Sequence, residues 1–394
     1  MTTNDKNGTL PEGPLSGITV IDLSRILAGP YCTMMLCELG ARVIKIETPE
    51  TGDDAREYGP FVNGKSAYFQ SVNRGKESIV LNLKDTNDKK IFGKLLTDAD
   101  VLVENFRPGT MDKLGFGWDS IKSNYPQLIY ASASGFGHSG PEMYRPAYDM
   151  VVQGMGGIMS VTGHPGTPPT RIGMSIGDIG SGLYATIGIQ AALFHRQLTG
   201  RATKVDIGML DCQIALLENA VMRYEVTGTA PGPLGARHPS ITPFEAFKTA
   251  DGYIIISAGN DALFAKLAEA LNKSEWIEDP DYSSNDKRNQ NVERLKMEME
   301  EVLSKQTTSH WIKVLDEFGV PSGPINDVGQ AATHPQTIAR NMIVSIDDPI
   351  TGTMRVAGNP IKISGFEDPK TRRPAPNLDE NKEQILAEFL PTNN

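Results

Sequence analysis

The chain has 394 residues, of which 39% are hydrophobic and 22% are charged, and its formal net charge is −10 at pH 7. These figures predict a globular protein of about two or three domains and exclude a wholly disordered chain, while the 39 glycines follow no three-residue period that would indicate a collagen-like rod. The acidic balance argues against general binding of nucleic acids, so any anionic ligand would need a local basic site.

The start of the chain and its cysteines indicate the compartment. Residues 1–14 are polar and lack the basic and apolar segments of a secretion signal, so we predict a disordered leader there. No apolar run approaches the roughly 20 residues that cross a bilayer. The three cysteines form no CxxC pair and the six histidines are scattered, which argues against a disulfide framework and a metal site. We therefore predict a cytoplasmic protein without nucleic-acid or membrane partners.

Strand-like and helical segments alternate over the first half of the chain. Helical spacing covers residues 30–39 and 87–96. Short β-rich runs occur at residues 18–23, 42–46, 78–83, 100–103 and 128–131. Such alternation requires crossover connections and therefore predicts an α/β fold, with a Rossmann-like large domain built on a mostly parallel sheet.

Residues 135–177 interrupt this alternation with many Gly and Pro residues, and a loop of that length is usually functional. Two motifs within it match known fingerprints without their context. Gly135–Gly140 fits G-x-G-x-x-G but no helical pattern follows it, and Gly173–Gly177 fits G-x-S-x-G but no strand pattern precedes it. We interpret both as tight turns, and a hydrolase that uses Ser175 stays as an alternative of another enzyme class.

Asp178 lies where this loop turns into a long apolar pattern. The commonest role of Asp at such a position is that of a helix N-cap, which involves no chemistry. The start of a helix also favours the ionised carboxylate that a nucleophile requires, and the glycines at 177, 180 and 182 would allow a substrate to approach. Asp178 is therefore a candidate nucleophile.

The second half of the chain predicts a smaller domain and a returning tail. Helices are expected at residues 178–198, 210–226, 261–271 and 291–303, and strands at 204–209, 253–257, 342–346, 354–358 and 361–365. With a linker at residues 228–233, these patterns indicate a large domain over 15–228, a small α/β domain over 235–330 and a C-terminal segment over 335–394 that returns to the large domain.

A second candidate site follows the expected strand at residues 100–103. Ligands bind at the carboxyl ends of parallel strands, and here Phe106 could stack on a base while Arg107 pairs with a phosphate. The alternative is an ordinary turn with a core Phe. Residues 73–76 add two cations before another expected strand, although alone they would be a solvated loop.

Longer blocks of sequence resemble the class III CoA-transferases, in particular their oxalate-using branch. The resemblance runs in the same order along nearly the whole chain, over residues 22–47, 52–56, 73–83, 99–116, 146–163, 199–211 and 237–253. It implies a CoA-binding large domain and a homodimer of two interlocked, ring-like chains. Residues 228–233 and 325–335 would then connect the two domains.

The resemblance also implies the chemistry. Asp178 would attack an acyl-CoA, form an aspartyl anhydride and then an aspartyl–CoA thioester, and pass CoA to a carboxylate. Acetyl-CoA and oxalate are the expected substrates, and no metal or other tightly bound cofactor is implied. A glycine-containing loop at Ala258, Gly259 and Asn260 would cover the site. The residues implied to bind CoA are Leu27, Ala28, Asn73, Arg74, Lys76, Asn105, Phe106, Arg107 and Lys113.

Some positions depart from related enzymes. Leu27 and Phe136 stand where the formyl-CoA transferases carry Gln and Tyr, which favours acetyl-CoA as the donor. Formyl-CoA with oxalate, and other acyl-CoA and carboxylate pairs, stay open. The related racemases need a His-Asp step where this chain has Tyr148-Asp149, so a two-base racemisation would lack one base. A CoA-binding subunit without turnover is the non-enzyme alternative.

Overall fold

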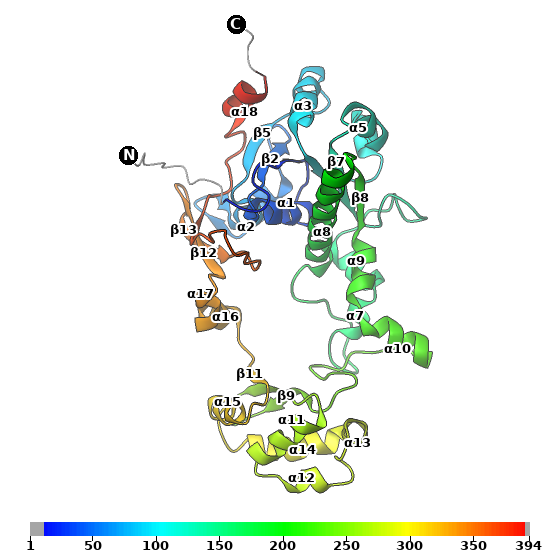
Figure 1. The fold of residues 1–394 in the computed structure, drawn as a ribbon, viewed down its shortest axis with the longest axis vertical. Helices are drawn as coiled ribbons and strands as arrows, with labels where there is room; N and C mark the ends of the chain where they lie inside the picture. Colours follow the sequence, from blue (N-terminus) through cyan, green and yellow to red (C-terminus); the bar gives the residue numbers. More distant parts are fainter. Residues whose placement is uncertain (1–11, 391–394) are drawn as a thin grey trace. The chain divides into compact units, whose positions relative to one another are not determined.

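The computed structural model describes residues 12–390 (Figure 1). The described residues form two compact units: residues 12–160, 171–231 and 335–390 make the larger unit, and residues 161–170 and 232–334 make the smaller unit. The disordered leader predicted for residues 1–14 lies almost wholly outside the described residues.

A six-stranded parallel sheet forms the centre of the larger unit, as the alternating pattern predicted. Its strands are β1 (Thr19–Asp22), β2 (Arg42–Glu47), β5 (Glu77–Val80), β6 (Val101–Glu104), β7 (Ile129–Ser134) and β8 (Lys204–Gly208). They lie in the order β5-β2-β1-β6-β7-β8, and every neighbouring pair is parallel. Counted along the chain, this is the doubly wound order 3-2-1-4-5-6, which reverses direction between β1 and β6.

Both faces of this sheet are covered, because successive side chains of each strand point to opposite sides. On one face, Val20 and Val43 pack with α1 (Ala28–Glu38) and α8 (Ile176–Thr199). On the other face, Ile21 packs with the helices α3 (Thr86–Asp98), α4 (Thr110–Leu114), α5 (Trp118–Asn124) and α18 (Lys382–Phe389).

The two helices of the first face approach each other closely at Gly182. A Cβ atom at this position would lie 2.8 Å from the carbonyl oxygen of Ala28 and 3.3 Å from the amide nitrogen of Cys32. Only glycine fits there without a shift of backbone. The close packing brings the second turn of α8 beside the start of α1.

Three predictions for individual elements are wrong. The helix expected over 210–226 is two helices, α9 (Met209–Leu216) and α10 (Asn219–Thr227), because Glu218 adopts a φ of 54° that breaks the ladder of hydrogen bonds. The loop expected over 135–177 contains α6 (Asp149–Met155) and α7 (Ile158–Val161). Residues 361–365 form no strand.

The remaining elements of the larger unit flank the sheet. They are η1 (Asp54–Glu57), β3 (Phe61–Val62), β4 (Lys65–Ser66), α2 (Ala67–Asn73), α17 (Pro335–Ala339), β12 (Ile343–Asp348), β13 (Gly352–Ala357) and β14 (Thr371–Arg372). Arg372 forms an ion pair of 2.8 Å with Glu38, the last residue of α1. This contact ties the C-terminal segment to the sheet-covering helices.

The smaller unit is built on an antiparallel sheet. Its strands are β9 (Phe244–Lys248), β10 (Tyr253–Ser257) and β11 (Ser322–Pro324), in the order β11-β10-β9. Its helices are α11 (Asp261–Ala270), α12 (Glu275–Glu278), α13 (Asn285–Gln290), α14 (Val292–Leu303), α15 (Thr308–Glu317) and α16 (Val328–Thr333). Residues 161–170 belong here in part because Gly235 N–H donates to Gly163 O at 2.8 Å.

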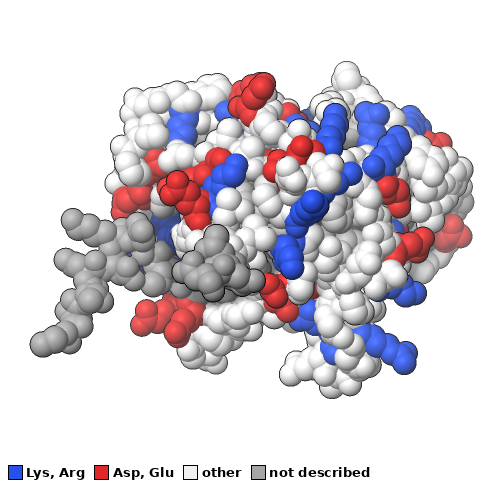
Figure 2. All heavy atoms as spheres, turned by 90° about the horizontal axis from the view of Figure 1, so that it is seen from above, with Lys and Arg blue, Asp and Glu red and all other residues white. Residues whose placement is uncertain are grey.

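The charges and the hydropathy of the described residues set further bounds. Figure 2 shows basic and acidic side chains interspersed on the face it presents. No helix within residues 12–390 combines the length and the apolar character that crossing a bilayer requires.

Candidate active site

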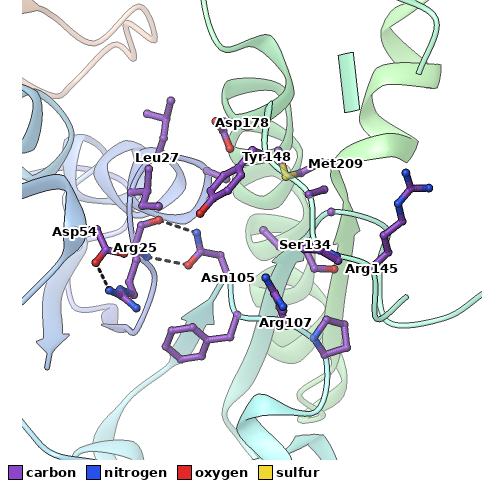
Figure 3. A pocket seen from close by; sticks show the side chains of 18 residues that line it. Arg25, Leu27, Asp54, Asn105, Arg107, Ser134, Arg145, Tyr148, Asp178 and Met209 are labelled. Carbon is purple, nitrogen blue, oxygen red and sulfur yellow. Dashed lines mark hydrogen bonds and ion pairs between the residues drawn. The ribbon is translucent and has the colours of Figure 1, made fainter. Parts of the chain in front are cut away.

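A cavity of about 280 Å³ opens at the point where the strand order reverses. Open α/β sheets bind their ligands at this point, since the loops after the two diverging strands separate there. The loops after β1 and β6 form part of the cavity wall, together with the end of β7, the segment before α6 and the first turn of α8 (Figure 3). Its lining includes Arg25, Leu27, Asn105, Arg107, Tyr148 and Asp178.

The side chain of Asn105 joins the two loops. Its amide oxygen accepts a hydrogen bond from Arg25 N at 2.8 Å, and its amide nitrogen donates to Arg25 O at 2.8 Å. The next residue of that loop, Ile26, has a φ of 69°, which a β-branched side chain rarely adopts. Ile26 N–H donates to Asp53 Oδ1 at 2.9 Å, so the surroundings hold the strained conformation.

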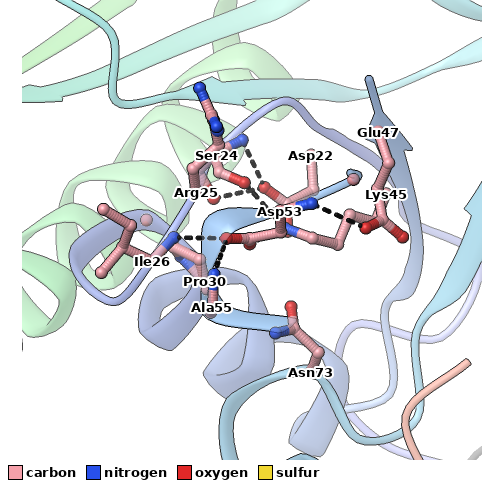
Figure 4. A network of polar contacts seen from close by, with 12 residues as sticks. Asp22, Ser24, Arg25, Ile26, Pro30, Lys45, Glu47, Asp53, Ala55 and Asn73 are labelled. Carbon is pink, nitrogen blue, oxygen red and sulfur yellow. Dashed lines mark hydrogen bonds and ion pairs between the residues drawn. The ribbon is translucent and has the colours of Figure 1, made fainter. Parts of the chain in front are cut away.

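A buried network of charged side chains holds the loop after β1 in place (Figure 4). Lys45 and Asp53, each 1% exposed, form an ion pair of 2.8 Å, and Lys45 Nζ also donates to Ser24 O at 2.7 Å. Burial alone would raise the pKa of Asp53, but the Lys45 ammonium outweighs it and holds that pKa below its usual range. The network therefore consists of matched charges that fix backbone.

Three of the residues implied to bind CoA are buried in polar contacts: Lys76 and Asn73 beside this network, and Arg74 in a separate ion pair. Lys76 Nζ donates to Asp22 Oδ2 at 3.0 Å and to Asn73 Oδ1 at 2.8 Å, and Lys76 is 2% exposed. Arg74 forms an ion pair of 2.7 Å with Glu38. Neither cavity described here is lined by these residues, and their contact with CoA stays a prediction.

The other implied residues fall into two groups. Leu27, Ala28, Asn105, Phe106, Arg107 and Asp178 line the cavity. Lys113 is exposed on α4 and does not line it. Gly259 and Asn260 lie in the smaller unit, where Asn260 Oδ1 accepts from Leu263 N at 2.9 Å and caps α11. The covering role of that loop is a prediction that no contact tests.

Glu104, at the end of β6, holds the backbone of the second loop. Its carboxylate accepts hydrogen bonds from Phe106 N at 2.7 Å and from the Tyr130 hydroxyl at 3.0 Å. Burial raises the pKa of Glu104 to about 7. Phe106 and Arg107 are thereby presented from a loop whose conformation is fixed by hydrogen bonds.

The electrostatic surroundings of Asp178 differ from the sequence-based expectation. Asp178 is the third residue of α8 and makes no cap, because the helix begins at Ile176 after Ser175 in the N-cap position. Burial and the nearby negative charge of Asp149 raise the pKa of Asp178 to about 7, which outweighs any preference for the ionised form at the helix start. Both protonation states are therefore populated near neutral pH.

A second cavity of about 310 Å³ lies at the carboxyl ends of β1, β2 and β5. Its lining includes Thr48 and residues 81–84. The two cavities share Arg25 and Phe106. A long ligand with an apolar arm and a charged middle could therefore extend from one to the other past these side chains.

Sequence reasoning missed several lining residues. Arg25 and Ser134 stand at or just beyond strand ends, a position that could have marked them. Ser134 is 7% exposed, and its hydroxyl has no hydrogen-bond partner among the described residues. Arg145 reaches the cavity from an irregular loop, and no pattern in the sequence indicated this.

The first motif match forms a turn, as predicted, whereas in the second only Gly173 and Met174 form a bend, and Ile176 and Gly177 already belong to α8. Gly137 and Gly140 have φ values of 76° and 83°, and no helix starts directly after them. Ser175 follows a segment without a strand, so the strand-to-helix elbow of a serine hydrolase is absent there. Within residues 12–390, no three His, Cys, Asp or Glu side chains are grouped in a way that could hold a metal ion.

The chain is similar in sequence and in structure to several known proteins. The pattern of CoA-transferase family III matches residues 15–382. Acetyl-CoA:oxalate CoA-transferase of Acetobacter aceti is 48% identical over 96% of either chain. Succinyl-CoA:glutarate CoA-transferase of Homo sapiens is 38% identical over 96% of this chain and 86% of its own. The crystal structure of a CAIB/BAIF family protein from Brucella suis has a TM-score of 0.84 and 40% identity, and covers 96% of this chain and 100% of that one.

Proposed function

The chain belongs to CoA-transferase family III, and from this premise we propose that it moves CoA from acetyl-CoA to oxalate with Asp178 as the nucleophile. One observation carries the proposal: the Asp178 carboxyl group faces a cavity at the switch point of the sheet that arginines also line. A carboxylate and local cations are what transfer from an anionic thioester requires.

The reaction divides into exchanges of acyl bonds. A carboxylate oxygen of Asp178 attacks the thioester carbon, the carbon–sulfur bond breaks, and CoA leaves as a thiolate with the bonding electrons. The thiolate then attacks the Asp178 carbonyl of the anhydride and releases acetate. Oxalate attacks the resulting aspartyl–CoA thioester and expels the CoA thiolate, which gives an aspartyl–oxalyl anhydride. The thiolate then attacks the oxalyl carbonyl of this anhydride, which forms oxalyl-CoA and releases the Asp178 carboxylate. Each step conserves charge and consumes no proton.

The two cavities suggest how CoA binds. We propose that the thioester end lies in the cavity with Asp178 and the nucleotide end in the second cavity. Arg25 and Phe106, which both cavities share, then contact the middle of the ligand, where the guanidinium suits phosphate and the ring suits the pantetheine arm. Leu27 and Ala28 border the reacting end at the start of α1.

The choice of substrates rests on similarity. The Acetobacter aceti relative supports acetyl-CoA and oxalate, whereas the relative from Homo sapiens is named for succinyl-CoA and glutarate. Both names describe the transfer of CoA to a dicarboxylate, and the second pair is the alternative. Oxalate and glutarate differ by three methylenes, and each methylene in a pocket changes binding by about 1–3 kcal/mol, so the size of the pocket selects between them and a substrate assay measures the outcome.

The assembly proposed for the chain is an interlocked homodimer. Support comes from apolar side chains that α8 and α10 expose: Ile187 is 62% exposed, Met222 64% and Val226 77%. A second copy would cover such a surface, since exposed apolar patches commonly mark interfaces. A cytoplasmic location stays a prediction.

A substrate matrix tests the function. Purified protein is incubated with acetyl-, formyl- or succinyl-CoA and with oxalate or glutarate, and the new CoA ester is identified by mass spectrometry. We expect oxalyl-CoA to form fastest from acetyl-CoA. Faster transfer to glutarate from succinyl-CoA would favour the alternative, and the absence of any new ester, with CoA thioester bound unchanged, would favour a binding subunit.

A further inference from the structure

Asp149 braces the start of the helix that carries Asp178. It is the first residue of α6 and is 7% exposed. One carboxylate oxygen accepts a hydrogen bond from Gly177 N at 2.8 Å, and the other accepts from Gln153 Nε2 at 2.8 Å. Gln153 is fully buried, and its amide oxygen accepts from Ile172 N at 3.0 Å. Helix α6 therefore holds both the segment that enters α8 and its first turn.

Gly177 makes this contact tight. A Cβ atom there would lie 2.7 Å from Val152 Cγ2 and 2.9 Å from Asp149 Oδ1. Any larger residue would push the first turn of α8 away from α6. The Asp149 carboxylate thus contacts Gly177, the residue directly before Asp178, and its position relative to Asp178 is fixed.

The charges around the two carboxyl groups do not neutralise them. Among the described residues, neither Asp149 nor Asp178 takes part in an ion pair. Of the arginines that line the cavity, Arg25 pairs with Asp54 and Arg145 with Glu142, whereas Arg107 is in no ion pair with another described residue. Tyr68 of α2 and Asp149 of α6 interact electrostatically with Asp178, and the other titratable or charged groups in the lining of its cavity are Arg25, Asp54, Arg107, Arg145 and Tyr148.

We propose that Asp149 is a positioning residue of the transfer reaction, which fixes the first turn of α8 and, by its negative charge, favours the acylated forms of Asp178 over the free carboxylate. This inference rests on the proposed function of Asp178. When Asp178 attacks the thioester, its charge moves to the departing sulfur, and the aspartyl group becomes neutral. Repulsion from Asp149 is relieved at that step and again in the aspartyl–CoA thioester. The raised pKa of Asp178, which burial and Asp149 cause, reflects the same repulsion.

The test compares Asp149→Asn with Gln153→Ala. The first variant removes the charge and, because Asn has only one acceptor oxygen, also one of the two hydrogen bonds that Asp149 accepts. The second variant removes the hydrogen bond from Gln153 and keeps the charge, so it is the control for that loss. The carboxyl carbon of Asp178, labelled with carbon-13, reports ionisation without any substrate. We expect Asp149→Asn to lower the titration midpoint of Asp178 by about one pH unit or more, and Gln153→Ala to leave it unchanged.

Trapping of the covalent state gives the second readout. With acyl-CoA present, mass spectrometry measures the fraction of enzyme that carries CoA on Asp178. A shift of one pH unit corresponds to about a tenfold change in equilibrium, so we expect about tenfold less thioester in Asp149→Asn. If both variants reduce the thioester equally while the midpoint stays in place, Asp149 acts only through packing and the proposal is overturned.

The wild-type protein supplies a measurement that needs no folded variant. Without substrate, the carbon-13 signal of Asp178 must titrate well above the value of about 3.9 for a free Asp side chain, and titration at that ordinary value overturns the proposal. Failure of the proposed function is distinguishable, because it would show as no thioester on Asp178 in the wild type while the titration still reported the effect of Asp149.

Discussion

Two pairs of aspartates in the larger unit, all buried except the half-buried Asp178, have opposite electrostatics. Asp22 and Asp53 face Lys76 and Lys45 in ion pairs, and their pKa values lie below the usual range because the ammonium groups outweigh the effect of burial. Asp178 has Asp149 beside it, and its pKa is raised to about 7 by burial and that like charge. The paired charges at Asp22 and Asp53 hold a loop in place. The charge of Asp178 is not paired in this way, so a reaction that removes it, such as acylation, is favoured.

The same substitution, Asp to Asn, therefore has different consequences at the two sites. The largest expected effect is on catalysis at Asp178. Asp178→Asn removes the nucleophile, and we expect the transfer rate to fall by about 10⁴-fold or more, since loss of a covalent nucleophile has effects of this size. Transfer is measured by the appearance of the new CoA ester.

Ser175→Ala is the matched control, because Ser175 lies three residues away in the same turn. We expect it to keep a rate near that of the wild type. A variant pair with the reverse result would replace the carboxylate mechanism with a serine mechanism.

At the paired site the expected effect is on stability. Asp53→Asn leaves Lys45 buried without its partner, so we expect the free energy of unfolding to fall by about 3–5 kcal/mol at pH 7. The folded-state pKa of Asp53 is lowered, so its contribution is present above the unfolded pKa of about 3.9 and is lost as the pH falls through the folded value. The difference between wild type and variant should accordingly shrink in acid.

Urea denaturation at pH 7 and at a pH below the unfolded pKa of about 3.9, near pH 3, measures this difference. Asp54→Asn is the control, because Asp54 is the next residue but its side chain is 45% exposed in an ion pair with Arg25. We expect that control to change the free energy of unfolding by less than about 1 kcal/mol. Equal effects of the two substitutions would contradict the distinction between matched and exposed charges.

The smallest effect has the opposite sign. The folded-state pKa of Asp178 is about 7 and the unfolded value about 3.9, so the folded wild type binds more protons between these values and loses stability as the pH rises from 4 to 7. Asp178→Asn does not ionise and avoids this loss. We expect it to be more stable than the wild type by about 1–3 kcal/mol at pH 8 and similar to it near pH 4.

Urea denaturation at both pH values checks the sign. A variant that is less stable than the wild type at pH 8 would mean that Asp178 has a cationic partner in solution. The contrast between the two aspartate sites would then be wrong, because the aspartate at each site would pair with a cation.

Local patterns predicted the elements better than their ends. The alternation of strand and helix led directly to the parallel sheet, since periods of two and 3.6 residues depend only on neighbours in sequence. The break at Glu218 and the helix at Asp149–Met155 were missed, because contacts with distant segments decide them. Asp178 was found as a candidate from its place after the loop, but its neighbour Asp149 was noted only as the position that lacks a preceding His.

By itself, the sequence determined the fold class, the family resemblance and the choice of Asp178, since each depends on residue order and spacing. Only the tertiary structure decided which charges are matched: Lys45 and Lys76 are neutralised within a buried framework, whereas Asp178 lies beside Asp149 and forms no ion pair with another described residue. The physical reason is that the energy of a buried charge depends on distances of a few ångströms between segments far apart in the chain, and these distances exist only once the sheet and its helices have packed.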